Sequence, residues 1–374
     1  MAKFVFVSWD GGGNVAVALG IGAALLGRGH SVTVLGPASL RGSIRSVGLG
    51  HRELGAPPPL EPASRSQYLV EVVGSTVMRE DLCQLVEELD PDGLVIDCNL
   101  AWALELPVSV PTAVLVHTAL GLYLPVWQQV IDAANERRTA GGLPPLRPAA
   151  ETWRSRDLLL VASVRHFDRP PEPLPRNAAY VGLVKSPLRR GAPATSVLGP
   201  PGQPLVLVSY STDRLQNHAE RVQAALDALA ELPVRVIAST SGAFGIQQLS
   251  VPANATVVEY VPHDQVLPGA AVVVAHAGHG TTIAALCQGV PLVCVPGLGR
   301  DQVPIAGRVA ELGLGITVAD EATPADIRTA VTTILADSSY RRRAQEFRSR
   351  CGQSPGARTA AERLEAMLER PRAR

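Results

Sequence analysis

Residues 271–286 read Ala-Val-Val-Val-Ala-His276-Ala-Gly278-His-Gly280-Thr281-Thr-Ile-Ala-Ala-Leu, and this stretch decides the fold. Its apolar, β-branched start is typical of a parallel strand that is covered on both faces. Gly278 and Gly280 allow a sharp turn and the close approach of a ligand. We expect a helix to begin at Thr281 and the next residue, where free N–H groups and the helix dipole favour a phosphate. His276 then lies at the carboxyl end of the strand, where open α/β sheets bind ligands.

The composition is that of a globular protein, and its 374 residues are enough for two domains. Lys+Arg and Asp+Glu both number 34, so no basic surface is expected for nucleic acid or for an anionic membrane. The cysteines form no Cys-x-x-Cys pair, and neither a zinc site nor a disulfide framework is predicted. No apolar run approaches the roughly 20 residues of a membrane helix, and the N-terminus lacks a signal-peptide pattern. We therefore expect a cytoplasmic enzyme or binding protein.

Strands and helices alternate through the first half of the chain. We expect strands over 4–7, 31–35, 94–96, 112–116, 158–162 and 179–184, and helices over 15–26, 38–47, 70–88 and 127–138. This alternation predicts an α/β fold with a parallel sheet covered by helices on both faces. Polar residues follow three of these strands: Asp10 and Asn14 in a glycine-rich turn after the first, and Asp97 and His117 after two later ones.

A second run of alternating elements follows a break at 185–204, where proline, glycine and small residues show no periodicity. We expect strands over 205–208, 234–238, 256–260, 271–275 and 291–295, and helices over 219–230, 305–312, 324–335, 338–350 and 357–369. Two doubly wound domains joined by a linker predict a central cleft between facing carboxyl ends of their strands.

The motifs of the second half point to a family. They run in the order Tyr260-Val-Pro-His263, His276-Ala-Gly-His-Gly-Thr281, Gly289-Val-Pro291, Asp301-Gln302 and Arg308-Val309. This order resembles the donor-binding signature of the UGT-like (family 1) glycosyltransferases, which have the GT-B fold. Among them the chain is most similar to the actinobacterial enzymes that glycosylate natural products.

The resemblance implies a domain plan. An N-terminal acceptor-binding domain would span 1–184 and a linker 185–204. A C-terminal domain over 205–354 would bind the nucleotide-sugar donor, and the final helix, within 355–374, would pack back on the first domain.

The resemblance also implies roles for individual residues. His276 would contact the donor diphosphate, and Tyr260 would stack on the base, which Val261 would hydrogen-bond through its main chain. Asp301 and Gln302 would hold hydroxyl groups of the transferred sugar. The remaining contacts to phosphate would come from Ser211, Thr212, Gly278, Gly280 and Thr281. Trp9 and His117 would line the acceptor site, although a buried hydrogen bond is an equal interpretation for His117 and a core position for Trp9.

One departure from the family concerns the catalytic base. Many relatives carry a histidine in the first glycine-rich turn, held by an aspartate that follows a later strand. Here Asn14 stands in place of that histidine, while Asp97 falls where the aspartate is expected. An asparagine cannot act as a general base, so we expect either Asp97 or Asp10 to take the acceptor proton, or an acceptor that needs little help. Ala277, Ala284 and Ile305 also depart from the family pattern and leave the preferred nucleotide open.

The function expected from the sequence is an inverting, metal-independent glycosyltransferase. It would use a TDP- or UDP-sugar as co-substrate, with no cofactor, and a small natural-product acceptor, aromatic or polyketide. A homodimer and the choice between O-, N- and C-glycosylation are left open. The alternative is a catalytically silent homologue that binds nucleotide sugar or assists another glycosyltransferase, and Asn14 is the best argument for it. An epimerase with the same fold would need a second acidic cluster, which the sequence does not show.

Overall fold

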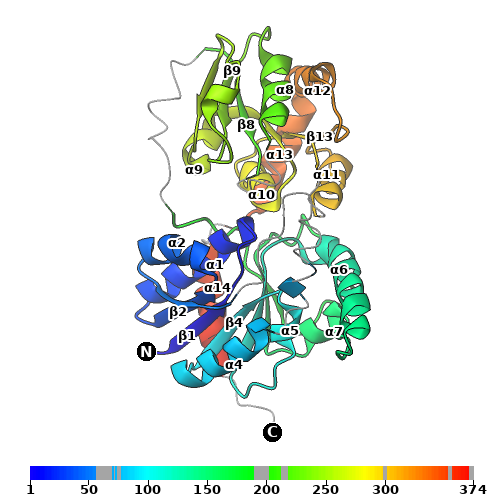
Figure 1. The fold of residues 1–374 in the computed structure, drawn as a ribbon. Helices are drawn as coiled ribbons and strands as arrows, with labels where there is room; N and C mark the ends of the chain where they lie inside the picture. The colour runs from blue at the N-terminus through cyan, green and yellow to red at the C-terminus, as the bar shows by residue number, and fades with distance from the viewer. Residues whose placement is uncertain are drawn as a thin grey trace. The chain divides into compact units, whose positions relative to one another are not determined.

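The computed structural model describes residues 1–55, 70, 72–73, 77–188, 202–211, 218–297, 301–352 and 356–369. The chain divides into two compact units, one formed by Met1–Leu188 with Gln353–Arg374 and the other by Arg189–Gly352. Each unit contains one sheet whose strands are all parallel (Figure 1). The predicted α/β class with two doubly wound sheets is therefore confirmed. Residues 189–201 of the predicted linker and Thr212 of the predicted donor site lie outside the described residues.

The first unit has a seven-stranded sheet in the order β3-β2-β1-β4-β5-β6-β7. Its strands are β1 Lys3–Val7, β2 Ser31–Gly36, β3 Gly50–Glu53, β4 Gly93–Asp97, β5 Thr112–Val116, β6 Leu158–Val161 and β7 Ala178–Tyr180. Its helices are α1 Gly13–Gly27, η1 Ala38–Leu40, α2 Arg41–Ser46, α4 Val77–Leu89, α5 Ala101–Leu104, α6 Leu120–Ala140, α7 Ala149–Arg154 and α14 Gly356–Leu368. Along β1, Val5 and Val7 pack in one core while Phe4 and Phe6 pack in another, so the sheet is covered on both faces.

The second unit has a six-stranded sheet in the order β10-β9-β8-β11-β12-β13. Its strands are β8 Leu205–Ser209, β9 Arg235–Ser239, β10 Ala255–Val258, β11 Ala270–Ala275, β12 Leu292–Cys294 and β13 Gly315–Thr317. Its helices are α8 Ala219–Leu229, η4 Ile246–Gln248, α9 His263–Val266, η5 Leu267–Gly269, α10 His279–Cys287, α11 Gln302–Glu311, α12 Pro324–Ala336 and α13 Ser338–Arg350. Within the described residues, no helix of either unit is long and apolar enough to cross a membrane.

The last helix, α14, belongs to the first unit although it comes last in the sequence (Figure 1). It is an amphipathic helix, and the buried side chains of Ala360, Leu364 and Met367 join the same core as Phe4 and Phe6. On its other side Glu365 forms an ion pair with Arg28 at 2.6 Å. Apolar burial thus attaches the end of the chain to α1, and the exposed ion pair adds little.

Several predicted boundaries differ from the structure, among them the helix predicted over 305–312, which begins at Gln302, and the three that follow. The helix expected at Thr281 begins two residues earlier, at His279, because Gly278 has the extended conformation of an N-cap. The strand expected over 179–184 is only β7, Ala178–Tyr180. The helix expected from residue 127 begins at Leu120, because the Asp168 carboxylate accepts hydrogen bonds from the N–H groups of Gly121 and Leu122.

The close packing of Gly121 gives a test of this fold. A Cβ atom at Gly121 would lie 1.5 Å from the carbonyl oxygen of Arg169, which is backbone and cannot rotate away. We predict that Gly121→Ala destabilises the first unit by about 3 kcal/mol or more. All four tryptophans of the chain lie in that unit, so urea unfolding followed by tryptophan fluorescence measures it selectively.

Gly42→Ala is the matched control, because no atom lies within 4 Å of a Cβ at this exposed position of α2. Alanine is the better helix former by about 1 kcal/mol, so this variant should be as stable as the parent or more so. Equal unfolding midpoints for Gly121→Ala and the parent would contradict the packing.

Candidate functional site

Each sheet has a topological switch point, which is the place where the strand order reverses. On one side of this point the chain adds strands in one direction across the sheet, and on the other side it adds them in the opposite direction. In the first unit this point lies at β1, which pairs with β2 and β4. In the second unit it lies at β8, which pairs with β9 and β11. Ligands of open α/β sheets bind outside the carboxyl ends of the strands at such points. The sequence-predicted residues divide between these two places.

The first switch point carries a buried polar group that we call the Asp97 cluster, formed by Trp9, Asn14, Asp97, Asn99 and His117. Asp97 ends β4 and keeps only 2% of its surface exposed. Its Oδ1 accepts hydrogen bonds from Trp9 Nε1 at 3.3 Å and from the Asn99 N–H at 2.9 Å. Its Oδ2 accepts one from Asn14 Nδ2 at 3.0 Å and faces His117 Nδ1 at 3.4 Å. Both carboxylate oxygens are therefore fully engaged by donors.

Asn14 and Trp9 reach Asp97 because the first turn is tightly folded. Asn14 lies in the first turn of α1, and its Nδ2 also donates to the Trp9 carbonyl at 3.0 Å. Gly11 is required here, since a Cβ atom would lie 2.6 Å from the Trp9 ring. Gly12 has a φ of 81°, a conformation that glycine adopts without strain. The glycines thus bring the indole N–H and the amide to one carboxylate.

The electrostatics of the cluster favour an ion pair. Burial alone would raise the pKa of Asp97, but the charge of His117 and hydrogen bonds from His117, Asn99 and Asn14 hold it below its usual value. Burial alone would lower the pKa of His117, but the charges of Asp97 and Cys98 and their hydrogen bonds raise it well above its usual value. Each group of the pair therefore favours the charged form of the other.

Cys98 adds a thiol to this cluster. Its Sγ lies 3.8 Å from His117 Nδ1 and 3.2 Å from Asn99 Oδ1, and burial raises its pKa. Ligand atoms of Asp97, Cys98 and His117 all lie within 4.8 Å of one another, which is close enough for a metal. They are satisfied by hydrogen bonds among themselves and from Trp9 and Asn14, so we assign them no metal.

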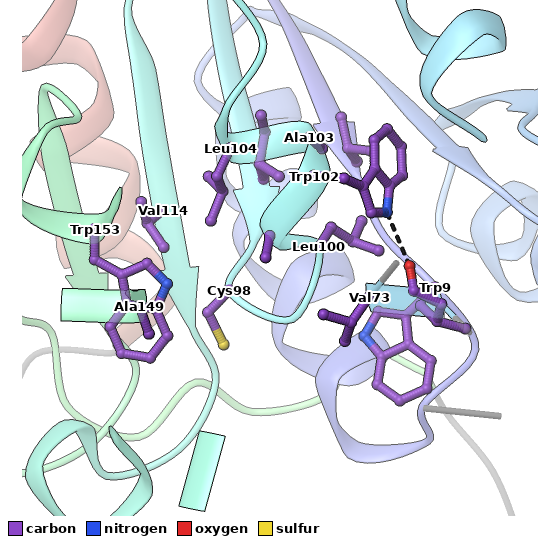
Figure 2. Close-up of a cluster of buried hydrophobic side chains, with 14 of the residues drawn as sticks. Trp9, Val73, Cys98, Leu100, Trp102, Ala103, Leu104, Val114, Ala149 and Trp153 are labelled. Atoms are coloured by element: carbon purple, nitrogen blue, oxygen red, sulfur yellow. Dashed lines mark hydrogen bonds between the residues drawn. The ribbon is translucent and has the colours of Figure 1, made fainter. Parts of the chain in front are cut away.

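An apolar core packs next to the cluster. Figure 2 shows Trp9, Val73, Cys98, Leu100 and Trp102 among the buried side chains of this region. The indole N–H of Trp102 donates to the Val72 carbonyl at 2.9 Å. Because these large side chains are closely packed, the polar groups next to them have little freedom to move.

Asp10, the other carboxylate predicted from the sequence, lies apart from this network. Its side chain is exposed, and its Oδ2 accepts a hydrogen bond from Ser39 Oγ at 2.7 Å. The structure therefore brings together Trp9, Asn14, Asp97 and His117, but it does not add Asp10 to them.

The second switch point carries what we call the His276 cluster, formed by Ser209, Tyr210, Arg221, His263 and His276. His276 directly follows β11 and is 7% exposed. The Tyr210 ring is stacked against its imidazole at 6.4 Å between ring centres, and the Arg221 guanidinium lies 5.9 Å from the centre of the Tyr210 ring. Ser209 Oγ is 3.0 Å from His263 Nε2. The carboxyl ends of β8 and β11 are thus joined by aromatic and imidazole groups.

His276 is a neutral imidazole at physiological pH. Burial, followed by the charge of Arg221, lowers its pKa to about 4. Its Nδ1 is buried and has no hydrogen-bond partner among the described residues. Burial lowers the pKa of His263 as well. A neutral imidazole with an unused nitrogen can bind a ligand without carrying a charge of its own.

The N-terminus of α10 lies directly beside His276. Gly278 is its N-cap, and a Cβ there would lie 2.2 Å from His276 Nε2, so only glycine fits. No side chain caps this helix, and its first hydrogen bond runs from Thr282 N to the Gly278 carbonyl. A Cβ at Gly280 would meet nothing within 4 Å. This arrangement offers N–H groups to an anion, as helix N-termini do.

The remaining predicted donor residues lie around the same edge of the second sheet. Ser211 is buried after β8, Val261 is buried after β10, and Tyr260 precedes it in a half-buried position. Asp301 is the N-cap of α11 but makes no side-chain cap. Gln302 is buried, and its Oε1 accepts from the Gly297 N–H at 2.7 Å, so its carbonyl oxygen positions a loop.

Sequence reasoning missed Tyr210, Arg221 and His263 as members of the site. Arg221 comes from α8 and donates to the Pro296 carbonyl at 3.0 Å and to Asp320. It therefore holds together turns that follow β12 and β13, far apart in the sequence. No local pattern marks such a residue, whereas His263 does belong to the Tyr260–His263 motif.

The comparisons with known proteins agree with this geometry. Residues 223–367 match the family described as erythromycin biosynthesis protein CIII-like, C-terminal domain. These comparisons show that the chain has the GT-B fold and is similar to UGT-like glycosyltransferases, among them actinobacterial enzymes of natural-product biosynthesis.

Individual relatives cover the whole chain. The 4'-demethylrebeccamycin synthase of Lentzea aerocolonigenes is 26% identical over 98% of this chain and 100% of its own length. The calicheamicin glycosyltransferase CalG4 has a similar structure, with a TM-score of 0.78 and 24% identity over 99% of both chains. The glycosyltransferase VinC, solved in complex with DTDP, has a TM-score of 0.74 and 19% identity over 99% of this chain and 100% of its own. At these identities the two structures show the fold.

The ion pair of the Asp97 cluster can be tested in solution. In Asp97→Asn the charge that raises the pKa of His117 is lost while the burial that lowers it remains. We predict that the pKa of His117 then falls from above 6.5 to below it. Titration of the histidine Cε1–H resonances by NMR measures this, with His117 assigned from its loss in His117→Gln.

Asp10→Asn is the control for the same titration, because Asp10 is bonded to Ser39 and is not part of the cluster. It should leave the His117 resonance unchanged. A His117 pKa that is the same in Asp97→Asn and the parent would show that the two groups are not paired.

Proposed function

We propose that the chain transfers a sugar from a nucleoside-diphosphate donor to a small natural-product acceptor, with inversion at the anomeric carbon and without a metal. The second unit binds the donor and the first binds the acceptor. One observation carries this proposal: a neutral, buried His276 with an unused nitrogen stands beside the uncapped N-terminus of α10. That pairing suits a diphosphate, because the helix end supplies positive charge and the imidazole an N–H donor.

We infer the donor-binding roles from the family resemblance, and the places of the described residues support them. His276, the Ser211 hydroxyl and the N–H groups at Gly280 and Thr281 bind the diphosphate, and Gly278 allows the close approach. Thr212, which lies outside the described residues, keeps the phosphate-binding role that the family resemblance gives it. Tyr260 stacks on the base, which Val261 binds through its main chain, and Asp301 and Gln302 face the sugar. Diphosphate departure is then favoured by the same donors, because negative charge on its oxygens grows as the bond to the sugar breaks. These donors do the work that a cation does in other transferases.

On the acceptor side, Asp97 takes the part of an orienting carboxylate. It is engaged by Trp9, Asn14, Asn99 and His117, and its pKa is below its usual value. Such a carboxylate is a weak proton acceptor. Asp10 is exposed and remains the alternative carboxylate base. Asn14 acts through its amide, and Trp9 and His117 line the acceptor site, where an aromatic or polyketide acceptor fits their ring faces.

Turnover tests this function directly. Purified protein is incubated with TDP-glucose or UDP-glucose and a panel of phenols and polyketide aromatics, and glycoside and free nucleotide are quantified by chromatography and mass spectrometry. We expect equal amounts of glycoside and nucleoside diphosphate, a β-glycoside from an α-linked donor, and no loss with EDTA. Nucleotide binding without turnover for any acceptor would overturn the proposal and favour the silent homologue, which Asn14 allows.

The donor site itself has a separate test. We predict that His276→Ala weakens TDP binding roughly 10-fold to 100-fold, because one donor to a charged oxygen is lost. Isothermal titration calorimetry at pH 7.5 measures it. His218→Ala removes an exposed histidine of the same unit and should leave the affinity unchanged. Equal affinity of His276→Ala and the parent would place the diphosphate elsewhere.

A further inference from the structure

His117 stands at the end of β5, next to the strand that ends in Asp97. The register pairs Asp97 with Leu115, so the chain leaves both strands at the same edge of the sheet. The His117 side chain is 17% exposed, whereas that of Asp97 is 2% exposed. The imidazole therefore lies between the buried carboxylate and the solvent.

The two ring nitrogens of His117 have different environments. Nδ1 faces Asp97 Oδ2 at 3.4 Å and Cys98 Sγ at 3.8 Å. Nε2 has no hydrogen-bond partner among the described residues. It is also not one of the buried atoms that lack a partner, so Nε2 itself is not buried. Solvent therefore reaches Nε2. Asp97 fixes the tautomer with its proton on Nδ1, which leaves the lone pair on Nε2 for a ligand.

We propose that His117, oriented by Asp97, is the general base that accepts the proton of the acceptor. This proposal rests on the glycosyl-transfer function above. The O–H proton of the acceptor moves to His117 Nε2 while its oxygen forms a bond to the anomeric carbon. The bond from that carbon to the diphosphate oxygen breaks, and its electron pair leaves with the nucleoside diphosphate. The imidazolium that forms is stabilised by the Asp97 carboxylate.

His117 is a better proton acceptor than the groups around it. Asn14 carries an amide and has no basic lone pair on nitrogen. Asp97 has donors on both oxygens, and Cys98 is fully buried. Asp10 is exposed and bonded to Ser39, outside the cluster. An imidazole that follows β5 thus supplies the basic nitrogen that the first turn lacks.

The titratable groups around the ring set its pH dependence. Asp97 and Cys98 face it from the end of β4, and the Tyr123 ring of α6 lies 6.2 Å away. The charge of Asp97 raises the pKa of His117, so the free base forms only above the usual range of histidine. Activity that depends on this base should therefore rise with pH through a value above 6.5.

The experiment compares His117→Gln with the parent, using TDP-glucose and the phenol of the panel that the parent glycosylates fastest. We expect kcat to fall by roughly 100-fold to 10,000-fold, the usual contribution of a general base. The rising limb of the pH profile of kcat/KM should disappear. TDP affinity should stay within twofold of the parent, which shows that the variant is folded and binds the nucleotide.

Chemical rescue separates a proton acceptor from a structural residue. In His117→Ala the ring is replaced by space beside Asp97, and added imidazole should restore kcat in proportion to its concentration. The same imidazole should not help His117→Gln, whose side chain still fills the position. His51→Gln is the control, because His51 lies on β3 and contacts the Gly36 carbonyl, away from the cluster. It should retain the kcat of the parent.

The outcomes distinguish the role of His117 from the glycosyltransferase function itself. Turnover by the parent with an unchanged kcat and pH limb in His117→Gln would overturn the role of His117 and leave the glycosyltransferase intact. A second outcome is a fall in kcat that imidazole does not restore in His117→Ala, together with an unchanged pH limb in His117→Gln. This outcome would show that His117 has a structural role, and it would also overturn the proposal that His117 is the base. Absence of turnover by the parent would overturn the proposed function, and the base with it.

Discussion

The network around the Asp97 carboxylate is the constraint on which the switch point of the first unit depends. Groups from three separate segments meet on it: the turn after β1, the end of β4 and the end of β5. A buried carboxylate is tolerated only when its oxygens are satisfied, so the glycines of the first turn and the register of β4 with β5 must place their donors together. Function follows from this stability requirement, because the same bonds fix one imidazole nitrogen and leave the other to solvent.

The second unit has the same kind of parallel sheet, but the histidines at its switch point have a different electrostatic environment. Its switch point carries two buried imidazoles, and burial keeps the pKa of both below the usual value. A neutral His276 beside an uncapped helix N-terminus suits an anionic ligand, whereas a His117 free base beside a carboxylate suits proton acceptance. The two switch points thus differ in whether a carboxylate stands next to the histidine that follows the strand.

Strong local patterns predicted most of the fold. The buried strands and the glycine-rich turn at His276 could be found from β-branched runs and glycine spacing, and α14 from its amphipathic face. The start of α6 could not, because its cap is Asp168, 47 residues away from Gly121. Likewise the pairing of His117 with Asp97 depends on β5 lying beside β4, and Arg221 joins turns that only the folded sheet brings together. Tertiary partners of this kind carry no signal in the sequence near them.

Hydrogen–deuterium exchange on the full chain, with and without TDP, tests the central claim most directly: that the two switch points have separate ligands. We predict slower exchange in peptides that cover 276–284, at the N-terminus of α10, and no change in those that cover 9–14, 97–99 and 117. Protection of the Asp97 cluster by TDP, with none at α10, would contradict the account.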